Sequence, residues 1–284
     1  MVIAFPTMNV TPFCLTTMRP AALALISLLG LESIHAALPV EPRTAESAVT
    51  PVEKSRHSDF MRQIKAAGGN FDFVLIGDSI TDFWPRSGKD SYARFAPWRP
   101  LDLGVSGETT EEVLWRLQNG ELDGIHPKVF MIMIGTNNTG HYPDEKPEWV
   151  AAGIKKIVET VRGKHPDSKI LLVGIFPRGV DSKDPVRRRN DEVNALLPAL
   201  QDGKHVFFLD IGPKFLDPEG ILSTGIMPDR LHPNAEGYRI WSEAVRPKLE
   251  ELMGSRMAPL KPQATPSPSA SPHSPSIPSS SPAR

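Results

Sequence analysis

Five short stretches of almost continuous apolar residues constrain the fold of this chain more than any other feature. They span residues 71–77, 100–104, 128–135, 169–176 and 205–211. A strand covered by helices on both faces requires such unbroken hydrophobicity, whereas a half-exposed strand alternates apolar and polar residues. The spacing leaves room for a helix between successive runs. The sequence therefore predicts a parallel sheet that is buried on both faces.

Helical patterns occupy the connections between these runs. Residues 109–120, 148–166 and 234–253 carry apolar side chains at helical spacing. The first segment opens at a threonine suited to capping, and the second stops at Gly163 and Pro166. Strands that alternate with helices form layered α/β folds. We therefore expect an α/β protein, a three-layer α/β/α sandwich with a central parallel sheet of about five strands.

The N-terminal segment differs in composition from this domain. Arg19, an apolar run over residues 21–31 and small residues near Ala36 predict a signal peptide over residues 1–36. The run is too short to span a membrane as a helix, so we expect a secreted or periplasmic protein without stable membrane insertion. A buried N-terminal helix is the alternative, and Met18 is an alternative start.

The rest of the chain divides into three segments. We assign residues 37–51 to a linker, 52–254 to a single domain and 255–284 to a disordered tail. The tail is rich in proline and serine, a composition that cannot form a core. Cys14 is the only cysteine and would leave with the signal peptide. The exported protein would then contain neither a thiol nor a disulfide.

Composition and missing motifs exclude several classes of function. The formal net charge of the 284 residues is -1, which argues against nucleic-acid binding, since that normally requires a basic face. The basic run 187–189 is interpreted as a solvated helix face rather than a phosphate site. We find no dinucleotide or phosphate loop, no Gly-x-Ser-x-Gly elbow and no zinc-binding pattern. We therefore expect no metal and no organic cofactor.

Polar groups follow the predicted strands at the point where each strand ends. Asp78 and Ser79 follow the first run, and residues 104–110, 135–141 and 227–238 hold further polar or glycine-rich loops. In an open parallel sheet these ends converge on one edge. Together they supply the groups that acyl transfer needs, which are a hydroxyl nucleophile, a histidine base, a carboxylate and donors for an oxyanion.

Two of these loops also have an ordinary structural explanation. The stretch GDSIT, residues 77–81, is suited to a turn with a helix cap, and DRLHPN, residues 229–234, to a turn that caps the last helix. His232 differs from the other histidines because Asp229 lies three residues before it. A carboxylate there can accept from Nδ1–H and leave Nε2 facing a serine.

Four of these blocks, in this order, resemble those of the SGNH, or GDSL-type, hydrolases. The blocks are GDSIT (77–81), GVSGETT (104–110), GTNN (135–138) and DRLHP (229–233). The resemblance covers about residues 71–251. It is closer still to the catalytic subunits of intracellular platelet-activating-factor acetylhydrolase, through the run 113–141 and the FPRG of residues 176–179. The resemblance implies the flavodoxin-like SGNH hydrolase fold.

The resemblance also implies a role for each matching residue. Ser79 would be the nucleophile, His232 the general base and then acid, and Asp229 the residue that orients it. The oxyanion hole would combine the backbone N–H groups of Ser79 and Gly107 with the side-chain amide of Asn137. A tight acyl pocket would be lined by Ile80, Thr136 and Leu231. Alternatively, these last three side chains pack the loops beneath the site.

Residues beside the matched positions are expected to support the loops. Ser106 and Glu108 flank Gly107 where the mammalian branch usually has glycine and aspartate. We expect Ser106 to bond to its own turn, Asp78 to hold the serine loop, and Asn138, like Thr136, to organise the loop around Asn137.

The leading hypothesis is an exported serine esterase that cleaves short acyl groups from a small ester, either an acetylated lipid or a glycan. A carbohydrate O-acetyl esterase is the alternative, and it would be expected to expose aromatic residues near the cleft. Trp84, Trp98 and Trp149 are candidates, although aromatic side chains at such positions are more often part of the core. A non-catalytic binding protein on the same fold is the third reading. The resemblance also raises the pairing of two copies into a homodimer, because the mammalian subunits associate in pairs.

Overall fold

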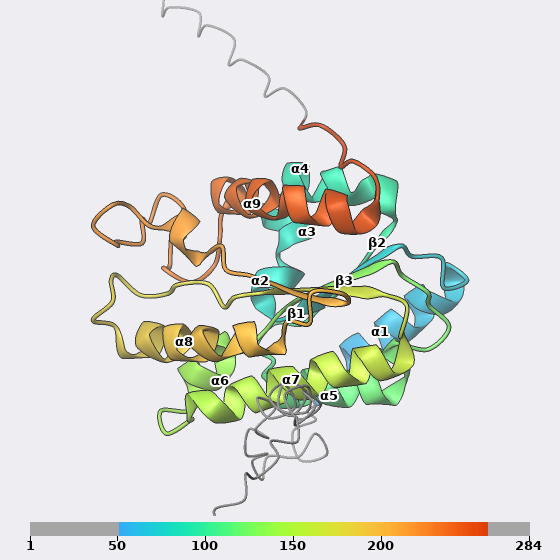
Figure 1. Cartoon of the computed structure of the whole chain (residues 1–284), viewed down its shortest axis with the longest axis horizontal. Helices are drawn as coiled ribbons and strands as arrows, with labels where there is room; N and C mark the ends of the chain where they lie inside the picture. Colours follow the sequence, from blue (N-terminus) through green and yellow to red (C-terminus); the bar gives the residue numbers. More distant parts are fainter. Residues whose placement is uncertain (1–50, 261–284) are drawn as a thin grey trace, which may run out of the picture. The chain divides into compact units, whose positions relative to one another are not determined.

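The computed structural model describes residues 51–260 of the chain. Its centre is a sheet of five parallel strands in the order β2-β1-β3-β4-β5 (Figure 1). The strands are β1 (Phe73–Gly77), β2 (Pro100–Gly104), β3 (Val129–Met133), β4 (Lys169–Val173) and β5 (Val206–Leu209). Each lies within one of the five apolar runs, which confirms the predicted sheet.

The order of the strands determines where a site can form. β1 pairs with β2 on one side and with β3 on the other, so that Gly77 lies beside both Gly104 and Met133. The chain therefore leaves β1 in one direction and returns to the opposite side of it for β3. At such a switch point the loops diverge and open a crevice beyond the carboxyl ends of the strands.

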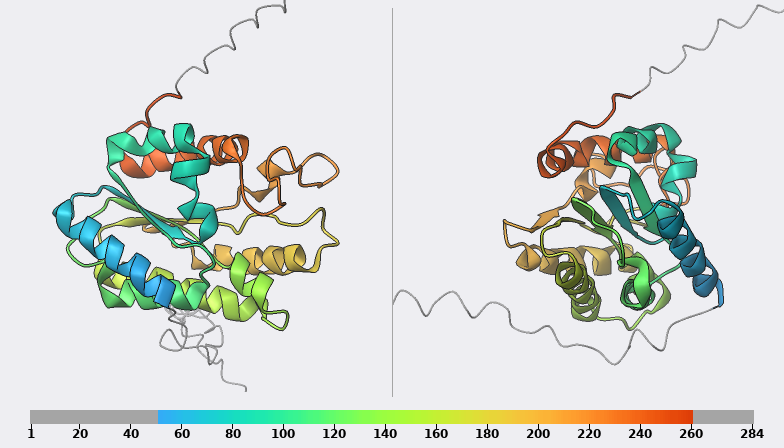
Figure 2. Two further views of the ribbon diagram at one scale, coloured as in Figure 1. Left: turned by 180° about the vertical axis from the view of Figure 1, so that it is seen from behind. Right: turned by 90° about the vertical axis from the view of Figure 1, so that its right-hand side faces the viewer.

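Helices cover both faces of the sheet and complete the predicted three-layer sandwich (Figures 1 and 2). We call the two helical layers the aliphatic layer and the aromatic layer, after the side chains that predominate in the core between each layer and the sheet. The aliphatic layer contains α1 (Pro51–Ala66), α5 (Thr110–Arg116), α7 (Pro147–Lys164) and α8 (Pro185–Leu196). The aromatic layer contains α3 (Trp84–Ser87), α4 (Lys89–Tyr92) and α9 (Ala235–Met253). Two short helices, α2 (Ser79–Asp82) and α6 (Thr136–His141), begin just beyond the ends of β1 and β3.

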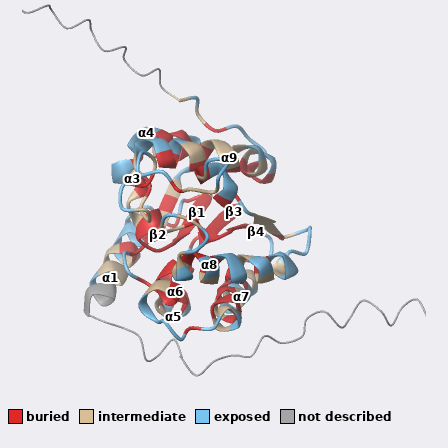
Figure 3. Cartoon of the chain, turned by 90° about the vertical axis from the view of Figure 1, so that its left-hand side faces the viewer, coloured by how far each residue is buried: buried red, intermediate tan, exposed pale blue. Residues whose placement is uncertain are grey.

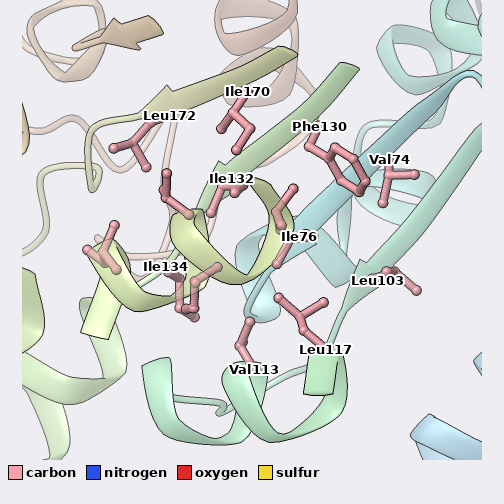
Figure 4. Close-up of a cluster of buried hydrophobic side chains, with 14 of the residues drawn as sticks. Val74, Ile76, Leu103, Val113, Leu117, Phe130, Ile132, Ile134, Ile170 and Leu172 are labelled. Carbon is pink, nitrogen blue, oxygen red and sulfur yellow. The ribbon is translucent and has the colours of Figure 1, made fainter. Parts of the chain in front are cut away.

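Alternate residues of each strand enter two separate cores, because successive side chains point to opposite faces of a sheet. Val74 and Ile76 face α5 and α7 in a mainly aliphatic cluster (Figure 4). Phe73 and Leu75 face the other side, in a cluster rich in tryptophan, tyrosine and phenylalanine. The central strands β1 and β3 are wholly buried and β4 nearly so, as the unbroken apolar runs predict, whereas three of the four residues of the edge strand β5 are half-buried (Figure 3).

Two of the tryptophans considered for glycan binding belong to this aromatic core. Trp84 is 0% exposed and Trp98 2%, and the ring of Trp84 stacks on Trp241 at a centroid distance of 4.0 Å. Trp84 and Trp98 are therefore core residues, the more common case for aromatic side chains at such positions, and cannot serve as exposed platforms for a glycan. Trp149 is half-buried and lies under the ammonium of Lys146.

The packed part of the chain continues beyond the expected end at Gly254. Trp98 Nε1 donates to the hydroxyl of Ser255 over 2.9 Å, and Met257 is buried in the aromatic core. Arg94 and Ala258 exchange two hydrogen bonds through main-chain and guanidinium groups. The boundary drawn from composition was therefore placed several residues too early, because four residues of ordinary composition, 255–258, still follow Gly254 before the proline-rich sequence begins.

The basic run is another correction. Arg187 is buried and donates to the carbonyl of Gly220, and Arg189 donates twice to the carbonyl of Thr139 in α6. Only Arg188 is exposed as a solvated face requires, because α8 turns its other two arginines toward neighbouring loops.

Several expectations concern residues outside the described range. The signal peptide, Cys14, most of the linker and the tail beyond Leu260 belong to them. Between residues 51 and 260, no helix has both the length and the apolar character needed to cross a bilayer.

Candidate active site

The turn from β1 into α2 holds Ser79 at the edge of the sheet. A Cβ on Gly77 would lie 2.1 Å from Thr81 Oγ1 and 2.7 Å from the carbonyl of Met133, so only glycine allows α2 to approach β3 this closely. Asp78 then caps the helix by accepting from the N–H of Ile80 over 2.9 Å. Because α2 has only four residues, its macrodipole is small. The N–H groups of Ile80, Thr81 and Asp82 all donate to Asp78, which leaves the N–H of Ser79 as the first-turn donor for a ligand.

Asp78 is fully buried, and its Oδ2 has no hydrogen-bond partner among the described residues. Burial raises the pKa of this carboxyl to about 6, although the bond from Ile80 and the nearby His232 and Arg178 oppose the rise. The expected structural role of Asp78 in holding the loop agrees with its cap. No local pattern in the sequence indicates that a carboxyl so close to the serine lacks a second hydrogen-bond partner.

Ser79, His232 and Asp229 form a continuous chain of hydrogen bonds. Ser79 Oγ lies 2.9 Å from His232 Nε2, and His232 Nδ1 lies 2.6 Å from Asp229 Oδ2. Ser79 comes from the end of β1, while the other two come from the loop before α9. The fold therefore brings Ser79 together with two residues that lie 150 and 153 positions further along the chain.

The loop with Asp229 and His232 is organised by its own backbone. Asp229 Oδ1 accepts from the N–H of Leu231 over 3.0 Å and from that of His232 over 2.7 Å. Burial opposes ionisation of Asp229, but these bonds and the imidazole together lower its pKa below the usual range. Arg230 adopts a φ of 57°, which is uncommon for a residue with a side chain and turns the loop back on itself.

The two further groups proposed for an oxyanion hole lie on neighbouring loops. Gly107 has a φ of 87°, which glycine adopts without strain, and it is exposed. Asn137 is 5% exposed, and its Nδ2 donates to the carbonyl of Glu108 over 2.9 Å. An amide nitrogen carries two hydrogens, so this bond fixes the side chain and leaves the second hydrogen for an oxyanion.

Asn138 binds these two loops together, as expected for a residue that organises the site. Its Oδ1 accepts from the N–H of Thr110 over 3.0 Å, and its Nδ2 donates to Thr110 Oγ1 and to Glu111. The start of α5 is thereby held against α6. Ser106 donates to Asp82 of α2 over 2.8 Å, so its hydroxyl bonds to a neighbouring helix and not to its own turn.

The three residues expected in an acyl pocket have different surroundings. Ile80 is 1% exposed and lies in the aromatic core, and the half-buried Leu231 packs against the same cluster. Thr136 is buried, and its hydroxyl accepts from Arg178 and Asn190 over 3.3 Å each. Two of the three therefore share one cluster, while the hydroxyl of Thr136 is directed to polar partners.

Two residues that the sequence did not single out also adjoin the site. The ring of Phe83 lies 5.1 Å from the ring of His232. Arg178 donates to the carbonyl of Thr136 over 3.1 Å and so fixes the residue before Asn137. Burial lowers the pKa of Arg178, while Asp184, Asp78 and Asp229 oppose the change. Arg178 lies in the FPRG block, which gave the only signal for it.

No group of three histidine, cysteine, aspartate or glutamate side chains within residues 51–260 has an arrangement that could hold a metal ion. The chemistry that the described side chains can support is transfer of an acyl group to a serine. It needs the nucleophile, base and carboxylate in one line, with fixed donors on the other side of the serine.

Known proteins are similar to this chain in sequence, and solved structures are similar to it in fold. The model of the GDSL-like lipase/acylhydrolase family matches residues 75–240. Platelet-activating factor acetylhydrolase IB subunit alpha1 of Homo sapiens is 34% identical over 198 residues, which cover 69% of this chain and 83% of that protein. The alpha2 subunit of Rattus norvegicus is 36% identical over 185 residues, covering 65% and 77%.

Solved structures have the same arrangement at lower identity. A GDSL-like lipase from Bacteroides thetaiotaomicron matches with a TM-score of 0.59 and 19% identity, covering 69% of this chain and 97% of that one. An acetylxylan esterase from Geobacillus stearothermophilus matches with a TM-score of 0.51 and 21% identity, covering 66% and 95%. Likeness at these identities demonstrates a shared fold and says nothing of the substrate.

Proposed function

This chain belongs to the GDSL-like lipase/acylhydrolase family. From that premise we propose that it is a serine esterase that hydrolyses short-chain carboxylic esters. Among these esters we expect acetyl esters to be the preferred substrates. The observation that carries the proposal is the line of hydrogen bonds from Ser79 through His232 to Asp229. A serine between an aspartate and a helix needs no such histidine if its only function is to cap the helix.

In the proposed reaction, Ser79 Oγ attacks the acyl carbon and its proton passes to His232 Nε2. Asp229 accepts from Nδ1–H and stabilises the imidazolium that forms. The negative charge develops on the carbonyl oxygen, which faces the N–H groups of Ser79 and Gly107 and the free N–H of Asn137. When the ester bond breaks, His232 returns the proton to the alcohol oxygen.

Deacylation repeats these steps with water in place of the serine. The acyl group is now bonded to Ser79 Oγ, and His232 takes a proton from water as the water oxygen attacks the acyl carbon. Collapse of the second tetrahedral intermediate breaks the bond to Ser79, and His232 returns the proton to Oγ. The products are the carboxylic acid and the regenerated serine.

The nucleophile is tested by substitution and by covalent labelling. Ser79→Ala should lower kcat by roughly three or more orders of magnitude, because only binding and the oxyanion donors remain. A serine-directed phosphonate should label Ser79, and Ser106→Ala is the matched control that keeps the label. Labelling of Ser106 in the wild type, or loss of activity on adding EDTA, would overturn the mechanism.

The preference for a small acyl group rests on the branched side chains beside the serine. Overfilling a packed apolar site typically costs about 1–3 kcal/mol, which corresponds to a roughly 5- to 150-fold penalty. The kcat/KM for p-nitrophenyl esters should therefore peak at acetate, fall at butyrate and be very low at octanoate. Leu231→Ala should relax this order. Octanoate cleaved as fast as acetate would contradict the proposed acyl pocket.

The alcohol part of the substrate is tested with two panels. Relatives of this chain are named for platelet-activating factor, a lipid, and proteins of the same fold are named acetylxylan esterase and carbohydrate acetylesterase. With Trp84 and Trp98 in the core, we favour a small acetylated lipid ester over a polysaccharide. Release of acetate from acetylated xylan at a higher kcat/KM than from acetylated lipids would reverse this order.

We also propose that the enzyme is exported, on the apolar run of residues 21–31. The test is to express the full chain and to sequence the N-terminus of the protein recovered outside the cytoplasm. Cleavage near Ala36 supports the proposal, whereas an intact N-terminus in the cytoplasm contradicts it. Light scattering on the same material tests for pairing of two copies.

A further inference from the structure

Beneath the proposed oxyanion site, three charged side chains form a buried cluster that the reaction above does not use. Arg116, Glu108 and Glu121 are each 0% exposed. Arg116 binds Glu108 with two nitrogens, Nε to Oε1 over 2.8 Å and Nη2 to Oε2 over 2.6 Å. Its Nη1 donates to Glu121. Burying three charges is costly unless their geometry is specific, so a function for the cluster is to be expected.

Glu108 connects this cluster to both oxyanion loops. It follows Gly107 directly in the chain, so holding Glu108 in place restricts the positions that the N–H of Gly107 can reach. Its carbonyl accepts from Asn137 Nδ2 over 2.9 Å. Arg116 additionally donates to the carbonyl of Leu103 at the end of β2 over 2.9 Å, which ties the guanidinium to the sheet. The side chain of Glu108 is therefore held by Arg116, while its backbone carbonyl binds the side chain of Asn137.

The cluster reaches the surface through α1. His57 Nδ1 lies 3.0 Å from Glu121 Oε1, and the guanidinium of Arg116 lies 5.5 Å from the ring centre of Phe60. Burial raises the pKa of Glu108, while Arg116 opposes this rise by charge and by hydrogen bonding. The guanidinium thus keeps two carboxylates in place at once, and neither is free to turn toward the substrate.

We propose that Glu108, clamped by Arg116, is a positioning residue that sets the spacing between the Gly107 N–H and the Asn137 amide. This inference rests on the proposed esterase function of the same site. An oxyanion donor acts only when it is fixed at about 2.7–3.1 Å from the oxygen. A carboxylate chelated by a guanidinium is held in one orientation. Because Glu108 adjoins Gly107 and accepts from Asn137, holding its side chain restricts the movement of both donors.

The test is Glu108→Gln, which keeps the shape of the side chain and removes its charge. Arg116 then still has Glu121 as a charged partner, so the variant should fold. We expect kcat to fall about tenfold with KM within twofold, since only the transition state uses the donors. Phosphonylation of Ser79 should slow by a similar factor, because the phosphonyl oxygen occupies the same position. Arg116→Lys should lower kcat in the same direction, because a lysine cannot chelate a carboxylate with two nitrogens.

Glu243→Gln is the matched control. Glu243 pairs with the buried Arg94 over 2.5 Å in the aromatic layer, away from both oxyanion loops. It should leave kcat unchanged. A fall in kcat for Glu243→Gln equal to that for Glu108→Gln would show that removing the carboxylate partner of any buried arginine slows the enzyme, and would overturn the proposal.

A double-mutant cycle decides whether Glu108 acts through the oxyanion donors. In the Asn137→Ala background, Glu108→Gln should reduce kcat by less than it does in the wild type. If the fall in kcat of the double variant equals the product of the falls in the two single variants, the two residues act independently and the proposal is overturned. An unchanged kcat in Glu108→Gln alone, with turnover abolished in Ser79→Ala, overturns it and leaves the esterase function standing. Full turnover by Ser79→Ala would overturn both.

Discussion

The two sides of Ser79 are built in opposite ways. On one side, the loop of Asp229 and His232 is open, since the side chains are 55% and 27% exposed. On the other side, Asn137 and Glu108 are buried, at 5% and 0%. We call these the proton-transfer side and the oxyanion side. The first is held by hydrogen bonds within one short loop, and the second by bonds that join three separate segments of chain.

The difference follows from what each side would have to do. A histidine that exchanges protons with an alcohol and with water must be reached by both, so it cannot be sealed. Donors that stabilise an oxyanion gain strength from a site with few mobile dipoles and must not move as charge develops. An exposed base and a buried set of donors are therefore what ester hydrolysis at a serine requires.

The largest effect is expected on the proton-transfer side. His232→Ala should lower kcat by roughly three or more orders of magnitude, because no other described side chain lies in the line between Ser79 and Asp229. Steady-state kinetics on p-nitrophenyl acetate measures this loss. A residual kcat within tenfold of the wild type would show that another group takes the proton, and the comparison between the two sides would fail.

The next effect belongs to the oxyanion side. Asn137→Ala should lower kcat by about 10²–10³ with little change in KM, as for the loss of one oxyanion donor. Because Asn137 donates to the buried Glu108 carbonyl, circular dichroism should confirm that the variant is folded. A change confined to KM would mean that Asn137 binds the substrate in its ground state.

Asp78 lies between the two sides, and its buried carboxyl should make stability depend on pH. Its pKa is about 6 when folded, against 3.8 for the free group, so the folded state binds more protons between these values. Stability therefore falls as pH rises through this window, by about 3 kcal/mol in order of magnitude at 1.36 kcal/mol per unit. Asp78→Asn keeps a cap and should escape this loss.

Urea unfolding of wild type and Asp78→Asn at pH 4 and at pH 7 measures the effect. The variant should gain in relative stability at the higher pH. A difference in unfolding free energy that does not change with pH would show that Asp78 is solvated in the folded state. Asn234, which caps α9 on the proton-transfer side, is half-buried and does not titrate, so it provides a comparison.

The smallest effect concerns stability without chemistry. Ending the chain after Gly254 removes the buried Met257 and the partner of Trp98 Nε1, and should cost about 2 kcal/mol of unfolding free energy. Ending it after Leu260 should cost nothing measurable. In both proteins kcat per folded molecule should stay the same, because the losses lie in the aromatic layer. A fall in kcat for the shorter protein would connect α9 to the chemistry.

The sheet and the line of Ser79, Asp229 and His232 could be read from the sequence for one reason. Both leave local signals, which are unbroken apolar runs for buried strands and short blocks at strand ends for the site. The resemblance to the GDSL-type hydrolases is confirmed by the family match. The roles of the individual residues remain predictions, although the hydrogen-bond geometry agrees with them.

What the sequence could not provide was tertiary pairing between polar groups. Glu108 and Glu121 lie eight and five positions from Arg116. Glu108 precedes α5, and Glu121 follows a stretch with non-helical backbone angles, so no single helix or strand period relates the three residues. The depth of Trp84 and the packing of Met257 depend on α9 folding over the sheet. Contacts between residues that only the tertiary structure brings together leave no periodic pattern in the sequence.

The contact between Ser79 and His232 spans 153 positions, and this distance has a consequence for when the enzyme becomes competent. A ribosome adds about 5–20 residues per second, so the histidine follows the serine by about 8 to 30 s. Throughout that interval the nascent chain contains a nucleophile without its base. Tyr238, whose hydroxyl donates to the carbonyl of Ile80 across 158 positions, closes the arrangement later still. On the proposed mechanism, competence would therefore arrive only once His232 and α9 have been synthesised, and a chain that stalls before them could not attack an ester.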